Sequence, residues 1–264
     1  MIGDCGLTLQ PILGQSLPEI GYHIRADRQR RGYAKKAAAA CCECSFTNTP
    51  YKKLYSYCKY TNIPSFRTAE SIGMRFEAEY PDKDNGITHV SSLTKAEWLF
   101  TRLGFTFIKA GPNIAEELLG LCQSADRSSE RAPYETYPAR EETEESALAR
   151  GCLYTVKKNG QPAGAAALEE RDLSVCFSFL PAGEKACFLS ALVLEKESRG
   201  LGLGAAPVLR LLEAARERGC GLVRLTVNEK NLPACRCFLS NGFVTVGKAV
   251  SGGETFLAMQ CLLK

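Results

Sequence analysis

The sequence has no long apolar run. None of its 264 residues lies in an apolar stretch approaching the roughly 18 residues that a membrane-spanning helix needs. Residues 1–15 also lack the basic start and apolar continuation of a secretory signal peptide. We therefore expect a cytoplasmic protein with no membrane partner.

The cysteines lack the arrangement of a metal site or a disulfide framework. Their number, 13, is odd, and they are scattered through apolar segments, which favours free thiols in a reducing compartment. Cys41, Cys42 and Cys44 follow an alanine run, and no second Cys or His pair stands at ligand spacing. We expect these residues, and Cys235 and Cys237, to act as small buried apolar side chains, and we predict no metal ion.

A strong excess of one charge is also missing. The 33 Lys and Arg residues against 29 Asp and Glu residues give a net charge of +4, which implies no acidic polymer as partner. Positive charge is concentrated in residues 25–36, where six basic side chains accompany one aspartate. No helix-turn-helix, zinc-finger or aromatic RNA-binding signature accompanies this stretch, so we expect it to meet the phosphates of a small cofactor rather than a nucleic acid.

The strongest motif present is a glycine-rich turn between an apolar strand and a helix. The strand ends with Leu192, Val193 and Leu194, and the turn consists of Arg199, Gly200, Leu201, Gly202, Leu203, Gly204 and Ala205. Glycines let backbone N–H groups approach a ligand closely, and the start of a helix is the positive end of its dipole. The turn therefore predicts a binding site for a pyrophosphate.

Two kinds of nucleotide site share this motif. Gly200, Gly202 and Ala205 match the fingerprint of dinucleotide-binding proteins, and Glu229 lies near the position expected for a ribose-binding acid. This interpretation predicts a dehydrogenase that binds NAD. The other interpretation adds the later segment 231–243 to the turn.

The turn and that later segment together resemble the GNAT superfamily of N-acetyltransferases. In this family, Arg or Gln, two residues, Gly, one residue, then Gly or Ala binds the pyrophosphate of acetyl-coenzyme A. A downstream helix carries Asn, Ala three residues on, Tyr seven on, and Gly-Phe at its end. The matching residues are Arg199, Gly202, Gly204, Asn231, Ala234, Gly242 and Phe243, whereas the tyrosine position holds Phe238. A core helix closed by Gly242 as a C-cap is the purely structural alternative.

The same two blocks occur near the start of the chain. Gln29, Gly32 and Ala34 repeat the turn motif, and Asn62 follows Gln29 by 33 residues, as Asn231 follows Arg199 by 32. Blocks repeated in the same order at almost the same separation indicate an internal duplication. We expect an α+β protein with two tandem GNAT-like domains, residues 1–98 and 99–264, each a mixed sheet flanked by helices.

The two copies differ in extent. Aligning Gln29 with Arg199 places Met1 opposite Arg171, so we expect the first copy to lack counterparts of residues 105–170 and to be a coenzyme-binding half without a complete acceptor site. In the second copy, we predict a strand at 105–109, a helix at 113–124, and a hairpin of 153–158 and 163–169 around Asn159-Gly160. The acidic stretch 141–150 suits either recognition of a cationic amine or a solvated helix face.

The resemblance implies a mechanism and a set of contacts. The pantetheine arm lies along the strand before the turn, a neutral amine attacks the thioester carbonyl, backbone N–H groups stabilise the oxyanion, and a base removes the proton. The residues implied to contact acetyl-CoA are 192–194, 199–205, Asn231 and Phe238, and in the first copy Gln29, Arg31, Gly32, Tyr33, Ala34 and Asn62.

The catalytic base is less clearly marked. In the first copy, Glu19 matches a strand position that bears the base in some members of the family, which makes it the candidate base there. Leu189 stands opposite Glu19, so the matching strand of the second copy has no carboxylate. Glu195, just beyond that strand, and Glu170 are the nearest candidates. We predict acetyl transfer to a primary amine of a small molecule or peptide. The alternative is a non-catalytic acyl-CoA-binding module, which the absent tyrosine and strand carboxylate would suit.

Overall fold

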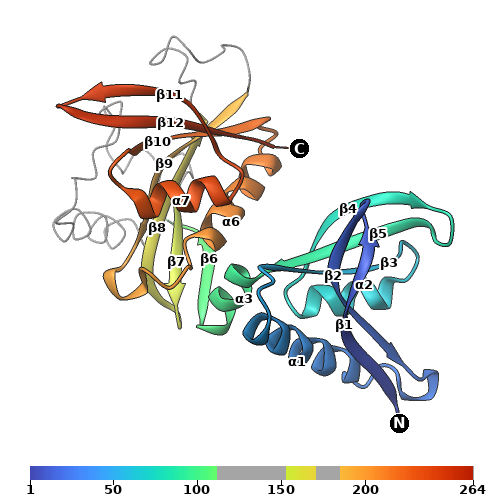
Figure 1. The fold of residues 1–264 in the computed structure, drawn as a ribbon. Helices are drawn as coiled ribbons and strands as arrows, with labels where there is room; N and C mark the ends of the chain where they lie inside the picture. Colours follow the sequence, from blue (N-terminus) through green and yellow to red (C-terminus); the bar gives the residue numbers. More distant parts are fainter. Residues whose placement is uncertain (112–152, 171–184, 264) are drawn as a thin grey trace. The chain divides into compact units, whose positions relative to one another are not determined.

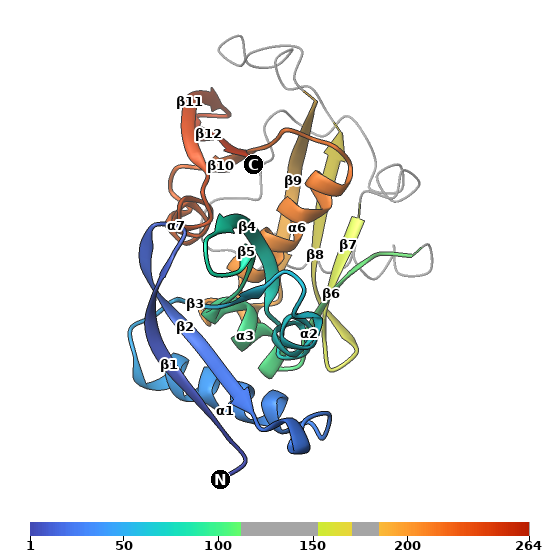
Figure 2. The ribbon, with the colours of Figure 1, turned by 90° about the vertical axis from the view of Figure 1, so that its right-hand side faces the viewer.

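The computed structural model describes residues 1–111, 153–170 and 185–263. The chain divides into two compact units, Met1–Leu99 and Phe100–Lys264. Each unit is a mixed sheet flanked by helices, as the α+β prediction requires (Figure 1, Figure 2). Within these described residues, no helix is long and apolar enough to cross a membrane.

Unit 1, residues 1–99, contains a five-stranded sheet of order β1-β2-β3-β5-β4 among its described residues. Only β2 and β3 pair in parallel. Helix α1 packs on β1 and β2, and α2 packs on β3 and β5. The elements are β1 (Gly3–Ile12), β2 (Gln15–Ile24), η1 (Ala26–Arg28), α1 (Tyr33–Asn48), β3 (Lys53–Lys59), α2 (Ile63–Ser71), β4 (Arg75–Asp82), β5 (Gly86–Thr94) and α3 (Lys95–Arg102), which continues into unit 2.

Helix α1 shows how the alanine-rich stretch of unit 1 folds. Ala38, Cys42 and Phe46 recur every four residues, so they share one face, and all three are buried in the core. Burial raises the pKa of the Cys42 thiol to about 12. Cys44 is exposed, so the expectation that it is buried is wrong. It lies two residues along the helix from Cys42 and therefore lies on a different face of α1.

Unit 2, residues 100–264, contains a seven-stranded sheet of order β11-β12-β10-β9-β8-β7-β6 among its described residues. Helices α6 and α7 contribute to its main core, which they share with β8, β9 and β10. The elements are β6 (Phe105–Lys109), β7 (Leu153–Lys158), β8 (Gln161–Glu170), β9 (Ala186–Leu194), η3 (Lys196–Ser198), α6 (Ala205–Glu217), β10 (Leu222–Asn228), α7 (Leu232–Ser240), β11 (Val244–Ser251) and β12 (Glu254–Leu262).

Several predicted elements of unit 2 are confirmed. Strand β6 has the predicted bounds, and β7 and β8 form the predicted hairpin, with Asn159 and Gly160 both at positive φ in its turn. The predicted helix at 113–124 and the acidic stretch 141–150 lie outside the described residues.

The two units share a β-bulge at equivalent positions. The ladder between β4 and β5 shifts register between Phe76 and Ala78, and the ladder between β11 and β12 shifts between Thr245 and Gly247. These two bulges occupy the same place in the two hairpins. Such agreement supports the internal duplication indicated by the sequence, since a bulge is a local insertion rather than a general property of sheets.

One expectation about the first copy is wrong in part. The fixed alignment left residues 105–170 without counterparts in unit 1, yet β1 lies against β2 as β8 lies against β9, whereas β6 and β7 have no matching strand among the described residues there. Gly3 pairs with Ile24, the last residue of β2, and Gly164 pairs with Leu194, the last residue of β9. The connection between the paired strands is much shorter in unit 1, and a fixed offset cannot follow that change.

Candidate functional site

The glycine turn of unit 2 lies between β9 and α6 and is tied to the strand before it. Arg199 donates from Nε to the carbonyl oxygen of Leu194 at 2.7 Å. Leu203 is buried in the turn, whereas Leu201 is 49% exposed. Among the described residues, no backbone carbonyl accepts a hydrogen bond from the amides of residues 200–204. The turn therefore presents a row of amide donors at the start of a helix, which suits an anion.

The three glycines of this turn have two different roles. Gly200 and Gly202 have φ angles of 75° and 73°, and a Cβ on either would have no heavy atom within 4 Å. These two glycines serve backbone conformation and leave open space beside the turn. A Cβ on Gly204 would lie 3.2 Å from Sγ of Cys237 on α7, so this glycine serves helix packing.

Strands β9 and β10 separate toward the turn. They pair in parallel only through residues 186–189 of β9. Beyond that point β9 continues along β8 to Leu194, and β10 continues along β12 to Asn228. Where two parallel strands stop pairing in this way, an extended ligand arm can lie between them and hydrogen-bond to their backbones.

The remaining predicted coenzyme contacts of unit 2 lie on α7. Asn231 caps this helix, and its Oδ1 accepts from the Ala234 amide at 3.2 Å. Phe238 is only 8% exposed and packs edge-on against Phe243, with ring centroids 5.5 Å apart. Gly242 follows Asn241, the C-cap of this helix, and has a φ of 87°, a left-handed conformation that suits glycine just after a helix.

The two candidate bases of unit 2 lie at opposite ends of the β8–β9 ladder. Glu195 follows β9 at the turn, where its Oε1 accepts from Oγ of Ser198 at 2.7 Å. Glu170 is exposed, pairs with Cys187 in the ladder, and lies 3.7 Å from Nζ of Lys185. The structure therefore does not bring these two carboxylates together.

A third carboxylate, Glu169, escaped the sequence reasoning. Its Oε1 accepts a hydrogen bond from Oγ of Ser190 at 2.6 Å. Ser190 is 8% exposed and occupies a β-bulge, because Ala167 pairs with Ala191 while Leu168 pairs with Leu189. No sequence signal marks this pair, since the two residues are brought together only by the register of β8 against β9.

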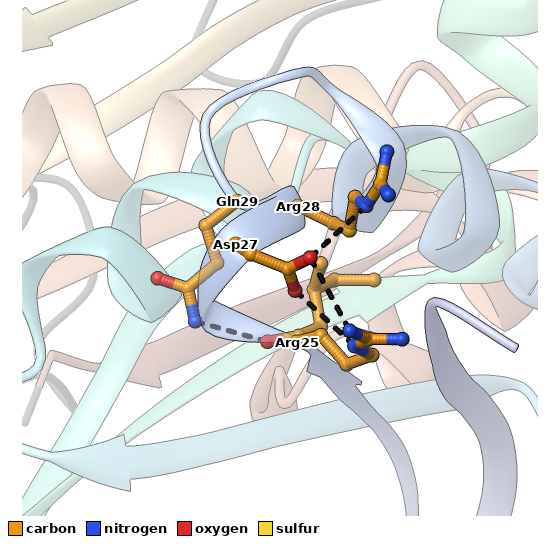
Figure 3. A network of polar contacts seen from close by, with 5 residues as sticks. Arg25, Asp27, Arg28 and Gln29 are labelled. Carbon is orange, nitrogen blue, oxygen red and sulfur yellow. Dashed lines mark hydrogen bonds and ion pairs between the residues drawn. The ribbon is translucent and has the colours of Figure 1, made fainter.

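The corresponding turn of unit 1 is built in the same way. Gln29 donates from Nε2 to the carbonyl oxygen of Ile24 at 2.9 Å (Figure 3). Gly32, with a φ of 78°, caps α1. Arg30 stands at the position of Gly200 and also has a positive φ, 59°. The amides of residues 30–34 have no backbone acceptor among the described residues.

The surroundings of that turn are more basic than those of unit 2. Asp27 accepts hydrogen bonds from both Arg25 and Arg28 at 3.2–3.3 Å (Figure 3). The other basic side chains of residues 25–36 are exposed to solvent. Tyr33 is 37% exposed, and Asn62 caps α2 by accepting from the Ser65 amide at 3.3 Å.

Glu19, the candidate base of unit 1, is buried in β2. Burial raises the pKa of its carboxyl, and a hydrogen bond from Oγ1 of Thr8 at 3.3 Å and the nearby His23 oppose that effect. Glu19 is therefore a carboxyl whose charged form is disfavoured by its surroundings.

Both units match known family models. Residues 1–75 match the model described as "Acetyltransferase (GNAT) domain", and residues 119–243 match "Acetyltransferase (GNAT) family". The chain belongs to the GNAT family. It therefore contains two GNAT segments in tandem, each with the turn and capped helix described above.

Curated relatives match part of the GNAT chain. YkkB of Bacillus subtilis (strain 168), an uncharacterized protein, is 36% identical over 75 residues, which are 28% of this chain and 44% of YkkB. YnaD of the same strain, an uncharacterized N-acetyltransferase, is 38% identical over 64 residues, which are 24% of this chain and 38% of YnaD. The chain thus spans less than half the length of the curated relatives it matches.

Solved GNAT structures share a more distant likeness. The acetyltransferase of GNAT family from Streptococcus pneumoniae is 19% identical with a TM-score of 0.48, covering 61% of this chain and 99% of that one. The yncA protein of Salmonella typhimurium, solved with its cofactor acetyl-CoA, is 17% identical with a TM-score of 0.47, covering 61% and 94%. The family assignment rests on the two model matches rather than on these likenesses.

Proposed function

We propose that unit 2 is an acetyl-CoA-dependent N-acetyltransferase acting on a primary amine of a small molecule or peptide. One observation carries the proposal: among the described residues, the amides of residues 200–204 have no backbone acceptor, and they follow the part of β9 that no longer pairs with β10. The pyrophosphate of the coenzyme would bind these amides. The pantetheine arm would lie along residues 190–194 as an additional strand.

The proposed reaction is a direct transfer of the acetyl group. A neutral amine attacks the thioester carbonyl, the C–N bond forms, the C–S bond breaks, and a base takes up the proton of the amine. Backbone N–H groups of residues 190–194 would stabilise the oxyanion. The coenzyme leaves as a thiolate, whose conjugate thiol has a pKa near 8.5, so it departs without an obligatory acid.

A charge introduced at the turn tests coenzyme binding without straining the backbone. Leu201 is half exposed and has no positive φ, so Leu201→Glu should fold normally while repelling a pyrophosphate. We expect calorimetry on the full chain to show acetyl-CoA binding that weakens at least about tenfold in this variant. Leu262→Glu, at the other end of the sheet, is the matched control and should bind like the wild type. Equal affinity in all three proteins would remove the site from the turn.

Turnover is tested by detecting free coenzyme A. Putrescine, glycinamide, benzylamine and a peptide with a free amino terminus sample the chemistry of primary amines. Release of coenzyme A that depends on one of these amines supports the enzyme. Binding without release from any of them supports the non-catalytic module, an alternative favoured by Phe238 at the family's tyrosine position and by a β9 strand without carboxylates.

For unit 1 we propose a second, weaker coenzyme site at residues 29–34. Two observations support this site. The turn is repeated, with the Gln29 side chain hydrogen-bonded to the end of the preceding strand as the Arg199 side chain is, and basic side chains surround it. Native mass spectrometry with acetyl-CoA should then find two bound copies per chain, one of which survives Leu201→Glu. A single copy that disappears in that variant would refute this second site. We also propose the cytoplasm as the compartment, which the scattered free thiols favour.

A further inference from the structure

Ser190 lies where β9 turns away from β10. Leu189, the residue before it, makes the last parallel pair with β10, to Leu225. Ser190 is also the extra residue of the bulge between β8 and β9. The bulge and the separation of the strands therefore meet at one residue, which places Ser190 at the closed end of the gap.

The side chains around this point face away from the helix-covered core. Leu168 and Leu189 belong to the core that α6 and α7 share, whereas Ala167 and Ala191 belong to a separate cluster with Leu153. Side chains two residues apart on a strand share a face, so Glu169 lies on the same face of β8 as Ala167. The Ser190 hydroxyl reaches the Glu169 carboxylate there at 2.6 Å.

The direction of this hydrogen bond decides what the serine offers. A serine hydroxyl has one proton and two acceptor lone pairs, and an ionised carboxylate can only accept. Ser190 Oγ donates to Oε1 of Glu169 at 2.6 Å and lies 3.5 Å from the carbonyl oxygen of Ala167, so its proton points to the closer Glu169 and its lone pairs remain to accept a further N–H.

We propose that Ser190 and Glu169 accept the proton of the attacking amine. The amine nitrogen forms a bond to the thioester carbon and gives a proton to Oγ of Ser190, while the Ser190 proton passes to Oε1 of Glu169. The C–S bond breaks and the thiolate of coenzyme A leaves. Glu169 then returns its proton to that thiolate or to water, so no proton or electron is left over. This inference rests on the proposed acetyltransferase function.

Unit 1 lacks this arrangement. Its β1–β2 ladder runs without a register shift from Gly3 to Ile12, so it has no bulge. Its carboxylate, Glu19, lies on β2, and its hydroxyl partner, Thr8, lies on β1, which reverses the strands of the two groups. The proton-accepting pair is therefore a property of unit 2.

Substitutions in the full chain separate this role from structure. Glu169→Gln keeps an oxygen that can accept from Ser190 but removes the basic carboxylate. We expect the turnover number to fall at least tenfold, toward the roughly 10²- to 10⁴-fold range of general-base catalysis, with the acetyl-CoA dissociation constant unchanged within about threefold. Ser190→Ala should lose a similar factor, and Ser190→Thr, which restores the hydroxyl, should recover most of it. Glu217→Gln, an exposed carboxylate of α6, should match the wild type.

Different outcomes reject different claims. If the wild type releases no coenzyme A with any amine, the acetyltransferase function fails and this pair fails with it. If the wild type is active and Glu169→Gln keeps its turnover within about threefold, only the pair is rejected. Should Glu169→Gln not fold, as judged by circular dichroism, the serine variants decide: equal turnover of the alanine and threonine variants overturns the proposal.

Discussion

Gln29 donates a hydrogen bond to the carbonyl oxygen of Ile24, and its counterpart Arg199 donates to the carbonyl oxygen of Leu194. In both units the first motif residue thus fixes the turn to the end of the strand before it. Its side chain acts on the protein's own backbone, which explains why an amide and a guanidinium can serve equally at this position.

Replacing Arg199 tests this role. Arg199→Gln should keep acetyl-CoA affinity within about threefold, because glutamine makes the same bond in unit 1. Arg199→Ala should lose about tenfold, as expected for one lost hydrogen bond from a charged donor. Calorimetry on the full chain measures both. A glutamine variant as weak as the alanine variant would show that the guanidinium charge itself matters.

Arg30 should tolerate replacement by glycine. A non-glycine residue in the left-handed region costs roughly 1–2 kcal/mol, whereas glycine costs about 0.5–1 kcal/mol in chain entropy. Arg30→Gly should therefore stabilise unit 1 by up to about 1 kcal/mol, while Arg31→Gly, which removes the same charge at a residue without positive φ, should destabilise it. Fluorescence of Trp98, the single tryptophan, reports urea unfolding of unit 1. The opposite order of the two variants would contradict this account of the turn.

Gly204 and Cys237 should be energetically coupled. A methyl group at Gly204 would crowd Sγ of Cys237, so Gly204→Ala should destabilise unit 2 by about 1–3 kcal/mol. Adding Cys237→Ala removes the sulfur, and the double variant should be more stable than the sum of the single effects predicts, by about 0.5 kcal/mol or more. Denaturant unfolding followed by circular dichroism gives the cycle. Simple additivity would mean that the two residues do not press on each other.

The buried carboxyl of Glu19 should make unit 1 less stable as the pH rises. Its folded-state pKa lies above the ordinary value of 4.5, so its favourable contribution is complete below pH 4.5 and is lost as the pH rises through the folded pKa. Glu19→Gln should therefore gain stability over the wild type on going from about pH 4.5 to about pH 7. Trp98 fluorescence at the two pH values measures this, with the exposed Glu70→Gln as control. A constant difference between Glu19→Gln and wild type across this range would be inconsistent with the raised pKa.

Phe238→Tyr should change the turnover number less than about tenfold, the low end of what a general acid provides. The coenzyme thiolate can leave without a proton, and the Phe238 ring is packed against Phe243 rather than exposed. Steady-state kinetics with saturating acetyl-CoA and the best amine provides the measurement. A gain of about a hundredfold or more would show that protonation limits the natural protein, and would favour the non-catalytic module.

Local patterns in the sequence were sufficient for the turn and its flanking elements. Glycine placement, strand alternation and the Asn-Gly turn act over a few residues, so the hairpin at Asn159 and the helix after the glycine turn could be predicted. The role of Gly204 could not, because it depends on a side chain of another helix. All three glycines look alike in sequence, yet only two of them need a positive φ.

Features that depend on pairing between distant strands were missed. Ser190 and Glu169 lie 21 residues apart, and only the register of their strands joins them. The equivalence of β1 and β8 was hidden for a related reason, since a changed connection length shifts the alignment without changing the sheet. The separation of two residues along the chain does not reveal the register in which their strands pair, and the register decides which side chains meet.

The paired bulges after Phe76 and Thr245 bear on the history of the chain. Regular strands arise readily in unrelated proteins, but the same interruption at the same rung of two hairpins is hard to reach independently. The residues around the two bulges have diverged while the defect has stayed. The ancestor of both units therefore already carried it, and backbone geometry has been inherited more faithfully here than the amino acids that form it.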